Sequence, residues 1–209
     1  MKKTQTPTTA QHPSFALSSL LILLVTLFTR GDPLSISSVD DFIDFANNVN
    51  SGSNYARETV YLINDLDFTG YSSSSVPVGK SNDTNIFRGT FDGNGHVISN
   101  LKVSSDEFPF LGVFGYSSGT TIKNLIVDGS CSFESNRSND NENIRVIGSI
   151  IAHCFSYDGE CVVEGCVNMA TIKYTGRSVD ICYLGGIAGV FTPFYSGTSS
   201  QTVRTMVIF

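Results

Sequence analysis

Residues 87–103 read FRGTFDGNGHVISNLKV, and this stretch decides the expected fold. It places a tight structural turn, Asp92-Gly93-Asn94-Gly95, between two short segments in which apolar and polar residues alternate. Weaker copies of its second half return further along the chain. A unit that recurs in this way cannot bury its own apolar face and must stack on its neighbours. The stretch therefore predicts a repeat architecture built from short strands.

Two sets of copies define the expected repeat. Residues 98–103 (ISNLKV) match residues 122–127 (IKNLIV) at an offset of 24 and residues 163–168 less closely. A second element, residues 112–115 (GVFG), returns at 149–152 and at 186–189 in steps of 37 residues. Stacked copies would form one interior row of Ile98, Ile122 and Val163 and a second row of Leu101, Leu125 and Cys166. Alternation along the strands also puts Val103 and Val127 in this core.

One segment, Ser38 to Val49, has a helical pattern. Ser38 can cap it, acidic residues occupy its first turn, and its apolar stripe consists of Phe42, Phe45, Ala46 and Val49. A strand is expected next, over residues 59–68. A helix that precedes a stack of strands can cover their exposed first edge, which would otherwise invite pairing with another chain.

The order of these motifs resembles that of the GLUG-type repeats of secreted and cell-surface proteins. The resemblance rests on residues 87–98, 112–115 and 119–125 (GTTIKNL); it is close over about 85–130 and looser over 145–190. It implies a right-handed parallel β-helix with no catalytic motif of its own, in a family that includes adhesin-like proteins and accompanies catalytic domains in some secreted peptidases. We therefore predict an all-β fold, a right-handed parallel β-helix (solenoid) with one N-terminal capping α-helix.

The chain divides into three predicted parts. Residues 1–31 form a signal peptide, because Lys2 and Lys3 precede a 14-residue apolar stretch, 15–28, that is shorter than a spanning helix. The capping helix and first strands occupy 32–80, and β-helix repeats occupy 81–209, with a truncated C-terminus where a further coil begins. The mature protein is then secreted or on the cell surface without a membrane span; an uncleaved anchor is the alternative.

Composition narrows the partners and the chemistry. The net charge of −6 argues against a nucleic-acid partner, which needs a basic face. The five cysteines are an odd number and leave the disulfide pairing open, but Cys131 and Cys166 are expected as small core residues. No CxxC pair occurs, so no metal or other cofactor is predicted. Asn82 and Asn136 begin acceptor sequons for glycosylation.

No catalytic residue is predicted. A glycoside hydrolase needs two carboxylates across a groove, and the candidates are Asp65, Asp67, Asp92 and Asp128. Asp92 is expected as a turn residue, and Asp65 and Asp67 as a solvated strand face. His96 is predicted to be a turn residue. His153 and Cys154 are adjacent on a strand and should point to opposite faces.

The predicted function is a non-enzymatic module for adhesion or display that contacts glycans or proteins. Aromatic residues near loops and strand ends could stack on sugars, or else close the corners of the fold: Phe108, Phe110, Tyr116, Phe191, Phe194 and Tyr195. The alternative is a carbohydrate-active β-helix enzyme, a polysaccharide lyase or hydrolase, and the third possibility is an inert spacer of a larger surface protein. Edge-to-edge self-association is also expected.

Overall fold

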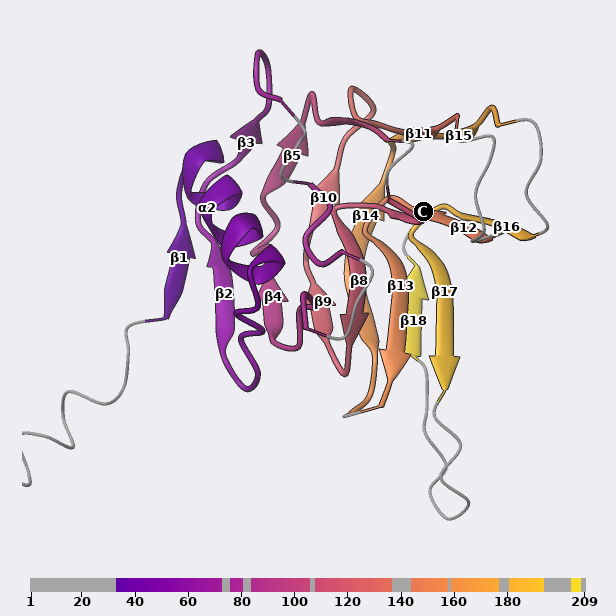
Figure 1. The fold of residues 1–209 in the computed structure, drawn as a ribbon. Coiled ribbons are helices and arrows are strands. Elements are labelled where there is room, and N and C mark those ends of the chain that lie inside the picture. The colour runs from indigo at the N-terminus through magenta and orange to yellow at the C-terminus, as the bar shows by residue number, and fades with distance from the viewer. Residues whose placement is uncertain are drawn as a thin grey trace, which may run out of the picture. The chain divides into compact units, whose positions relative to one another are not determined.

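A computed structural model describes residues 33–72, 76–80, 84–105, 108–136, 144–157, 159–176, 181–193 and 204–207. All of them belong to one compact unit, Pro33–Phe209. Within these ranges the chain forms one helix and many short strands (Figure 1). The predicted signal peptide, residues 1–31, lies outside the described residues.

The helix α2 (Val39–Asn50) forms where the apolar stripe predicts it. Ser38 is its N-cap: the Asp41 N–H donates to the Ser38 hydroxyl at 3.1 Å, and the Ser38 N–H donates to the Asp41 carboxylate at 3.1 Å. This capping box satisfies two backbone groups that the first turn cannot pair internally. The stripe itself is buried.

The largest sheet has nine strands among the described residues. Its strands follow one another in the order β1 (Leu34–Ile36), β2 (Thr59–Leu62), β4 (Thr90–Asp92), β9 (Thr121–Lys123), β14 (Val162–Asn168), β10 (Ile126–Val127), β5 (Val97–Ser99) and β3 (Leu66–Asp67), while β18 (Arg204–Val207) also pairs with β14.

Three further sheets have three strands each. Their strands are, in order, β15 (Thr171–Tyr174), β11 (Ser132–Ser135) and β6 (Lys102–Ser104); β16 (Ile181–Gly185), β12 (Ile144–Gly148) and β7 (Phe110–Leu111); and β17 (Ala188–Pro193), β13 (Ile151–Ser156) and β8 (Phe114–Ser118). Every pairing between these strands is parallel.

A cluster of phenylalanines joins α2 to the strands. The ring of Phe42 lies 6.4 Å from that of Phe91 in β4, and the ring of Phe45 lies 5.5 Å from that of Phe87. Phe114 extends the cluster, at 5.2 Å from Phe91. Each large buried ring contributes roughly 2–3 kcal/mol of burial free energy, so this cluster is the main attachment of the helix.

The predicted spacing of 37 residues between the GVFG-like elements is confirmed, because residues at this spacing pair between neighbouring strands. Ile151 of β13 pairs with Phe114 of β8 on one side and with Ala188 of β17 on the other. The GVFG-like elements therefore lie side by side in one sheet.

The predicted fold class, a right-handed parallel β-helix (solenoid) with one N-terminal capping α-helix, is wrong. The described strands form four parallel sheets with one short helix. The expected row of Ile98 above Ile122 does not exist: Ile98 pairs with Val127 of β10, whereas Ile122 pairs with Phe91 of β4 and Val163 of β14. The strand β1 precedes the helix in the chain and is an edge strand of the largest sheet.

The physical reason lies in a local bend that occurs more than once. Asn100, between β5 and β6, and Asn124, between β9 and β10, both adopt left-handed backbone conformations, with φ of 57° and 53°. Gly165, within β14, has φ of 60°. Similar sequences around the two asparagines therefore encode the same strand–bend–strand geometry, and they do not identify which strands are neighbours.

Candidate functional site

Five ring-bearing residues form a continuous group on the sheets that contain β7, β8 and β13. We call Phe110, Tyr116, His153, Phe155 and Tyr157 the aromatic strip. Phe110 comes from β7, Tyr116 from β8, and His153 and Phe155 from β13, which Tyr157 follows directly.

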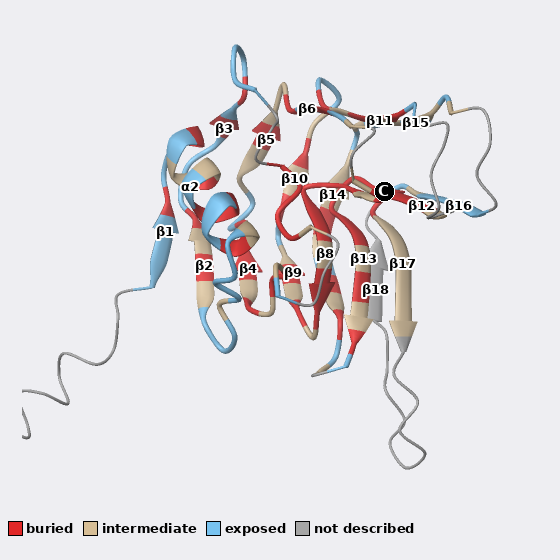
Figure 2. Ribbon diagram, in the orientation of Figure 1, coloured by how far each residue is buried: buried red, intermediate tan, exposed pale blue. Residues whose placement is uncertain are grey.

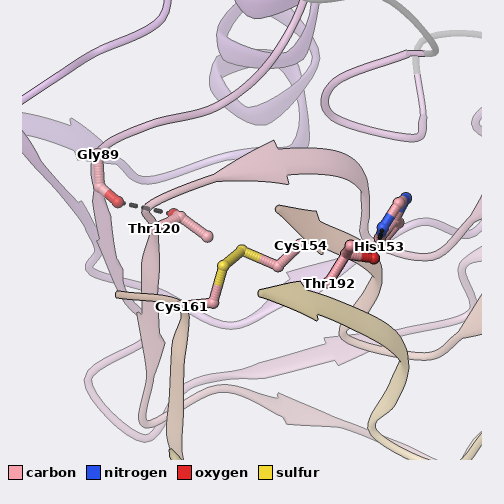
Figure 3. The surroundings of a disulfide bond; sticks show 6 residues. All are labelled: Gly89, Thr120, His153, Cys154, Cys161 and Thr192. Atoms are coloured by element: carbon pink, nitrogen blue, oxygen red, sulfur yellow. Dashed lines mark hydrogen bonds between the residues drawn. A yellow bond between two sulfur atoms is a disulfide. The ribbon is translucent and has the colours of Figure 1, made fainter. Parts of the chain in front are cut away.

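The strip lies on the face of β13 that is turned away from the core. Cys154 is fully buried in the core cluster, so alternation sends its neighbours His153 and Phe155 to the other face. Figure 3 shows the side chains of His153 and Cys154 pointing away from each other. The register then pairs His153 with Tyr116 of β8. The sequence argument that His153 and Cys154 do not meet agrees with this geometry.

The rings are in mutual contact. Phe110, Tyr116 and His153 form a triangle with centroid distances of 5.1–5.2 Å. Phe155 continues the strip at 6.3 Å from His153 and stacks on Tyr157 at 6.5 Å. Tyr157 is 58% exposed, and the other four are half-buried. The strip can therefore offer a partly exposed aromatic surface to a flat apolar partner such as a sugar face.

His153 is a neutral member of the strip. Burial lowers the pKa of this imidazole to about 4, so it carries no charge at neutral pH. Its Nε2 lies 2.8 Å from the Thr192 hydroxyl of β17, while its Nδ1 is buried without a hydrogen-bond partner among the described residues. A general base needs a pKa near the working pH, and the lowered pKa of His153 does not meet this requirement.

An open pocket adjoins the strip. Its volume is about 490 Å³, and it is lined by Ala56, Arg57, Arg88, Gly89, Thr90, Ser118, Gly119 and Thr121. Ser118 connects it to the strip, because Ser118 pairs with Phe155 in register and the Gly119 N–H donates to the Phe155 carbonyl at 3.1 Å. The volume falls within the range of small-ligand sites.

The predicted structural turn is formed by Asp92, Gly93, Asn94 and Gly95. The Asn94 N–H donates to the Asp92 carboxylate at 3.0 Å, and Asn94 and Gly95 have φ of 50° and 79°. Gly93 must be glycine for space, since a Cβ there would lie 2.5 Å from the Asn124 carbonyl oxygen.

Asp92 is a structural carboxylate. It is 7% exposed and accepts hydrogen bonds from Asn94, from Asn124 at 3.0 Å and from Lys123 at 3.2 Å. Burial raises the pKa of Asp92, but these bonds outweigh burial and hold the pKa below its usual value. The group is therefore ionised and fully engaged in its turn.

The other candidate acids are also held locally. Asp65 accepts from the Val97 N–H and lies 3.0 Å from His96 Nδ1, and Asp67 accepts from Asn100 and Thr69. Asp128 accepts from the Ser130 N–H at 2.9 Å. The hydrogen bond from Val97 lowers the pKa of Asp65 most strongly, and that from the Thr69 hydroxyl does so for Asp67. The lowered pKa values of Asp65 and Asp67 oppose a role for either as a general acid.

The remaining predicted residues take structural positions. The eight residues of the predicted rows are all buried, at 2% exposure or less: Ile98, Leu101, Val103, Ile122, Leu125, Val127, Val163 and Cys166. Asn136 is exposed, and Asn82 lies outside the described residues.

The cysteines separate into three kinds. Cys154 and Cys161 form a disulfide, which Figure 3 shows beside the Thr120–Gly89 hydrogen bond. Cys131 and Cys166 are buried thiols, and burial raises the pKa of each to about 11, which makes them poor nucleophiles. Cys182 is an exposed thiol on β16.

Sequence reasoning found part of the aromatic surface. Phe110 and Tyr116 belong to the strip, whereas Phe108 and Phe191 pack against the core. Phe194 and Tyr195 lie outside the described residues.

The three remaining members, His153, Phe155 and Tyr157, were missed. The offset of 37 residues would have placed Tyr116 beside His153, and the alternate ring positions that follow would have extended the group.

Two kinds of site are absent from the described part of the chain. No group of three or more histidine, cysteine or acidic side chains there could hold a metal ion. No helix within the same ranges has the length and hydrophobicity needed to cross a bilayer.

Comparison with known protein families gives no match, and comparison with curated proteins gives none. Among solved structures, the chain is similar to one described as a "putative immunoglobulin A1 protease" from Bacteroides ovatus. The match has 21% identity and a TM-score of 0.45, and it covers 78% of this chain and 54% of that one. The chain thus spans about half the length of that protein. A similarity this low transfers no activity to this chain.

Proposed function

We propose that this chain is a non-enzymatic module for adhesion or display, secreted or attached to a cell surface, that contacts glycans or proteins through the aromatic strip. The strip is the observation that carries the proposal. It exposes rings on an outer sheet face, with Tyr157 at 58% exposure. Rings that are held by neighbouring rings lose little side-chain entropy when a ligand stacks on them.

The chemistry of the acids supports a role without catalysis. Asp65, Asp67, Asp92 and Asp128 each accept hydrogen bonds from nearby donors. The pKa of Asp92 lies below its usual value, which opposes the proton donation that glycoside hydrolysis needs.

Two features support a secreted or surface location. The Cys154–Cys161 disulfide suits an oxidising compartment. The apolar stretch over residues 15–28 suits a signal peptide, and the resemblance to GLUG-type repeats suits a surface protein.

A glycan array tests the proposal, combined with an assay for newly released reducing ends or unsaturated products. We expect the unaltered protein to be retained on some glycans without forming product. The double variant F155A/Y157A should lose about tenfold in affinity, because each stacked ring contributes ~0.5–1.5 kcal/mol. Tyr71, an exposed tyrosine at 45% that lies outside the strip, provides the control variant Y71A, which should bind normally.

The other outcomes identify the alternatives. Product formation from a polysaccharide panel would establish the carbohydrate-active enzyme instead. Absence of both retention and product would exclude glycan contact by the strip and leave a protein partner or the inert spacer. Equal binding by F155A/Y157A and the unaltered protein would remove the strip as the contact surface.

A further inference from the structure

We propose that the pocket beside the aromatic strip binds the carboxylate or sulfate group of an acidic glycan, held by Arg57 and Arg88. The inference rests on the proposed glycan-binding function and specifies the class of sugar. It is carried by the charge of the pocket, by its hydroxyl-bearing wall and by its position at the end of the strip.

The pocket is locally cationic in an acidic protein. Its lining contains two arginines and no acidic residue, although the chain as a whole has a net charge of −6. Arg57 is exposed and forms no ion pair with another described residue. An anion that enters this pocket therefore meets two guanidinium groups and no lining carboxylate. Guanidinium groups also match the planar, two-oxygen geometry of carboxylates and sulfates.

Hydroxyl groups complete the wall. Thr90 of β4 and Thr121 of β9 pair in register, so their side chains are neighbours in the pocket lining. Ser118 is 3% exposed, and its hydroxyl has no hydrogen-bond partner among the described residues. A buried hydroxyl without a partner is costly, and an oxygen-rich ligand offers it one. This mixture of cations and hydroxyls suits a charged sugar better than an apolar ligand.

The turn that carries Arg57 is anchored to the core. Arg57 has a backbone φ of 67° and Tyr55 one of 54°, in a region that side chains of this size rarely adopt. The Tyr55 ring holds the turn in place, with centroids 5.3 Å from Phe45 and 6.3 Å from Phe87. Arg57 is thus presented at the pocket by a fixed backbone, which reduces the entropy lost on binding.

The pocket and the strip can act on one ligand. Ser118 lines the pocket and is the strand neighbour of Phe155 in the strip. A glycan that stacks on Phe155 can therefore place a charged substituent toward Arg88 and Arg57. Neutral units would contact the rings, and the acidic unit would occupy the pocket.

Calorimetric titration with four probes tests this inference: a heparin-derived hexasaccharide, tetragalacturonate, neutral maltohexaose and inorganic sulfate. The variants are R57Q, R88Q and the control K102Q, since Lys102 is an exposed cation on a different sheet. We expect R57Q and R88Q each to weaken at least one acidic probe about tenfold. K102Q should bind as the unaltered protein does, and added salt should weaken the acidic probe.

The outcomes separate this inference from the proposed function. Unchanged affinity in R57Q, which alters an exposed turn residue and should fold normally, would overturn the pocket assignment. So would the failure of both acidic probes while a neutral glycan is still retained. Inorganic sulfate that binds as tightly as the hexasaccharide would reassign the pocket to a simple anion. If F155A/Y157A left the affinity for the acidic probes unchanged while R57Q lowered it, the strip would be excluded as a contact surface. The assignment of the pocket as an anion site would be kept.

Discussion

Asn100 and Asn124 show how single residues set the path of this chain. Each adopts a left-handed backbone conformation, and each donates a side-chain hydrogen bond to an aspartate of another strand, at 2.8 Å to Asp67 and 3.0 Å to Asp92. Asparagine tolerates this backbone and also supplies the donor, so one residue type performs both tasks. Gly165 adopts the same conformation without a side chain.

The substitution G165A tests the importance of this bend. The φ of 60° is unfavourable for alanine, and the new Cβ would lie 2.7 Å from the Asn124 Oδ1. We expect the free energy of unfolding to fall by about 2 kcal/mol, measured by urea denaturation. The matched variant is G186A, because a Cβ on Gly186 meets no atom closer than 3.9 Å. Equal stability of the two variants would refute the role of the bend.

His153 should give the protein a dependence of stability on pH. Its pKa is about 4 in the folded chain, whereas an unfolded histidine has a pKa of about 6.5. Between these values the unfolded chain binds more protons, so stability falls as the pH falls from about 6.5 to 4, by roughly 3 kcal/mol in total. The variant H153F keeps a ring in the strip but has no titrating group. Urea unfolding at several pH values should show a flatter profile for H153F, and an unchanged slope would contradict this account.

At the scale of elements, the Cys154–Cys161 disulfide connects β13 to the segment just before β14. The two cysteines are seven residues apart and are both fully buried. A short loop closed in this way restricts the unfolded chain, which stabilises the fold by about 2–3 kcal/mol.

The double variant C154A/C161A should therefore unfold at lower urea concentration than the unaltered protein. The control is C182S, since Cys182 is an exposed thiol outside the disulfide. Addition of a reductant should lower the stability of C182S toward that of C154A/C161A and leave the double variant unchanged. A reductant effect on the double variant would place the stabilisation elsewhere.

Elements that depend on a local sequence pattern could be predicted. The pairing of strands that are distant in sequence could not. The capping residue and apolar stripe of α2 lie within one segment, so its position was predicted to within one residue. Ile98 pairs with Val127 and not with Ile122, so the shared asparagine bend predicted a neighbouring segment but not the register of the pairing. For the same reason Phe110 and Tyr116 were found, but their contacts with His153 were not.

At the scale of the whole described fold, each of the three smaller sheets ends in an edge strand, which pairs with a neighbouring strand on one side only. In the part of the chain that the structure describes, β15, β16 and β17 are each the last strand of a three-stranded sheet. β16 is the most exposed of them, as Figure 2 shows. Ile181, Tyr183 and Leu184 are 45%, 44% and 54% exposed. An edge strand with exposed apolar side chains is a template for pairing with another chain.

We expect the protein to self-associate through β16 as its concentration rises. The variant I181K places a charge on this edge and should shift the sedimentation profile toward the monomer, because lysine on an edge strand opposes pairing. Ile63 has the same exposure, 45%, but follows β2 outside any strand, so I63K is the matched control and should associate as the unaltered protein does. Sedimentation velocity over a concentration series measures both. If I181K and I63K associate to the same extent, general surface charge and not the β16 edge controls association.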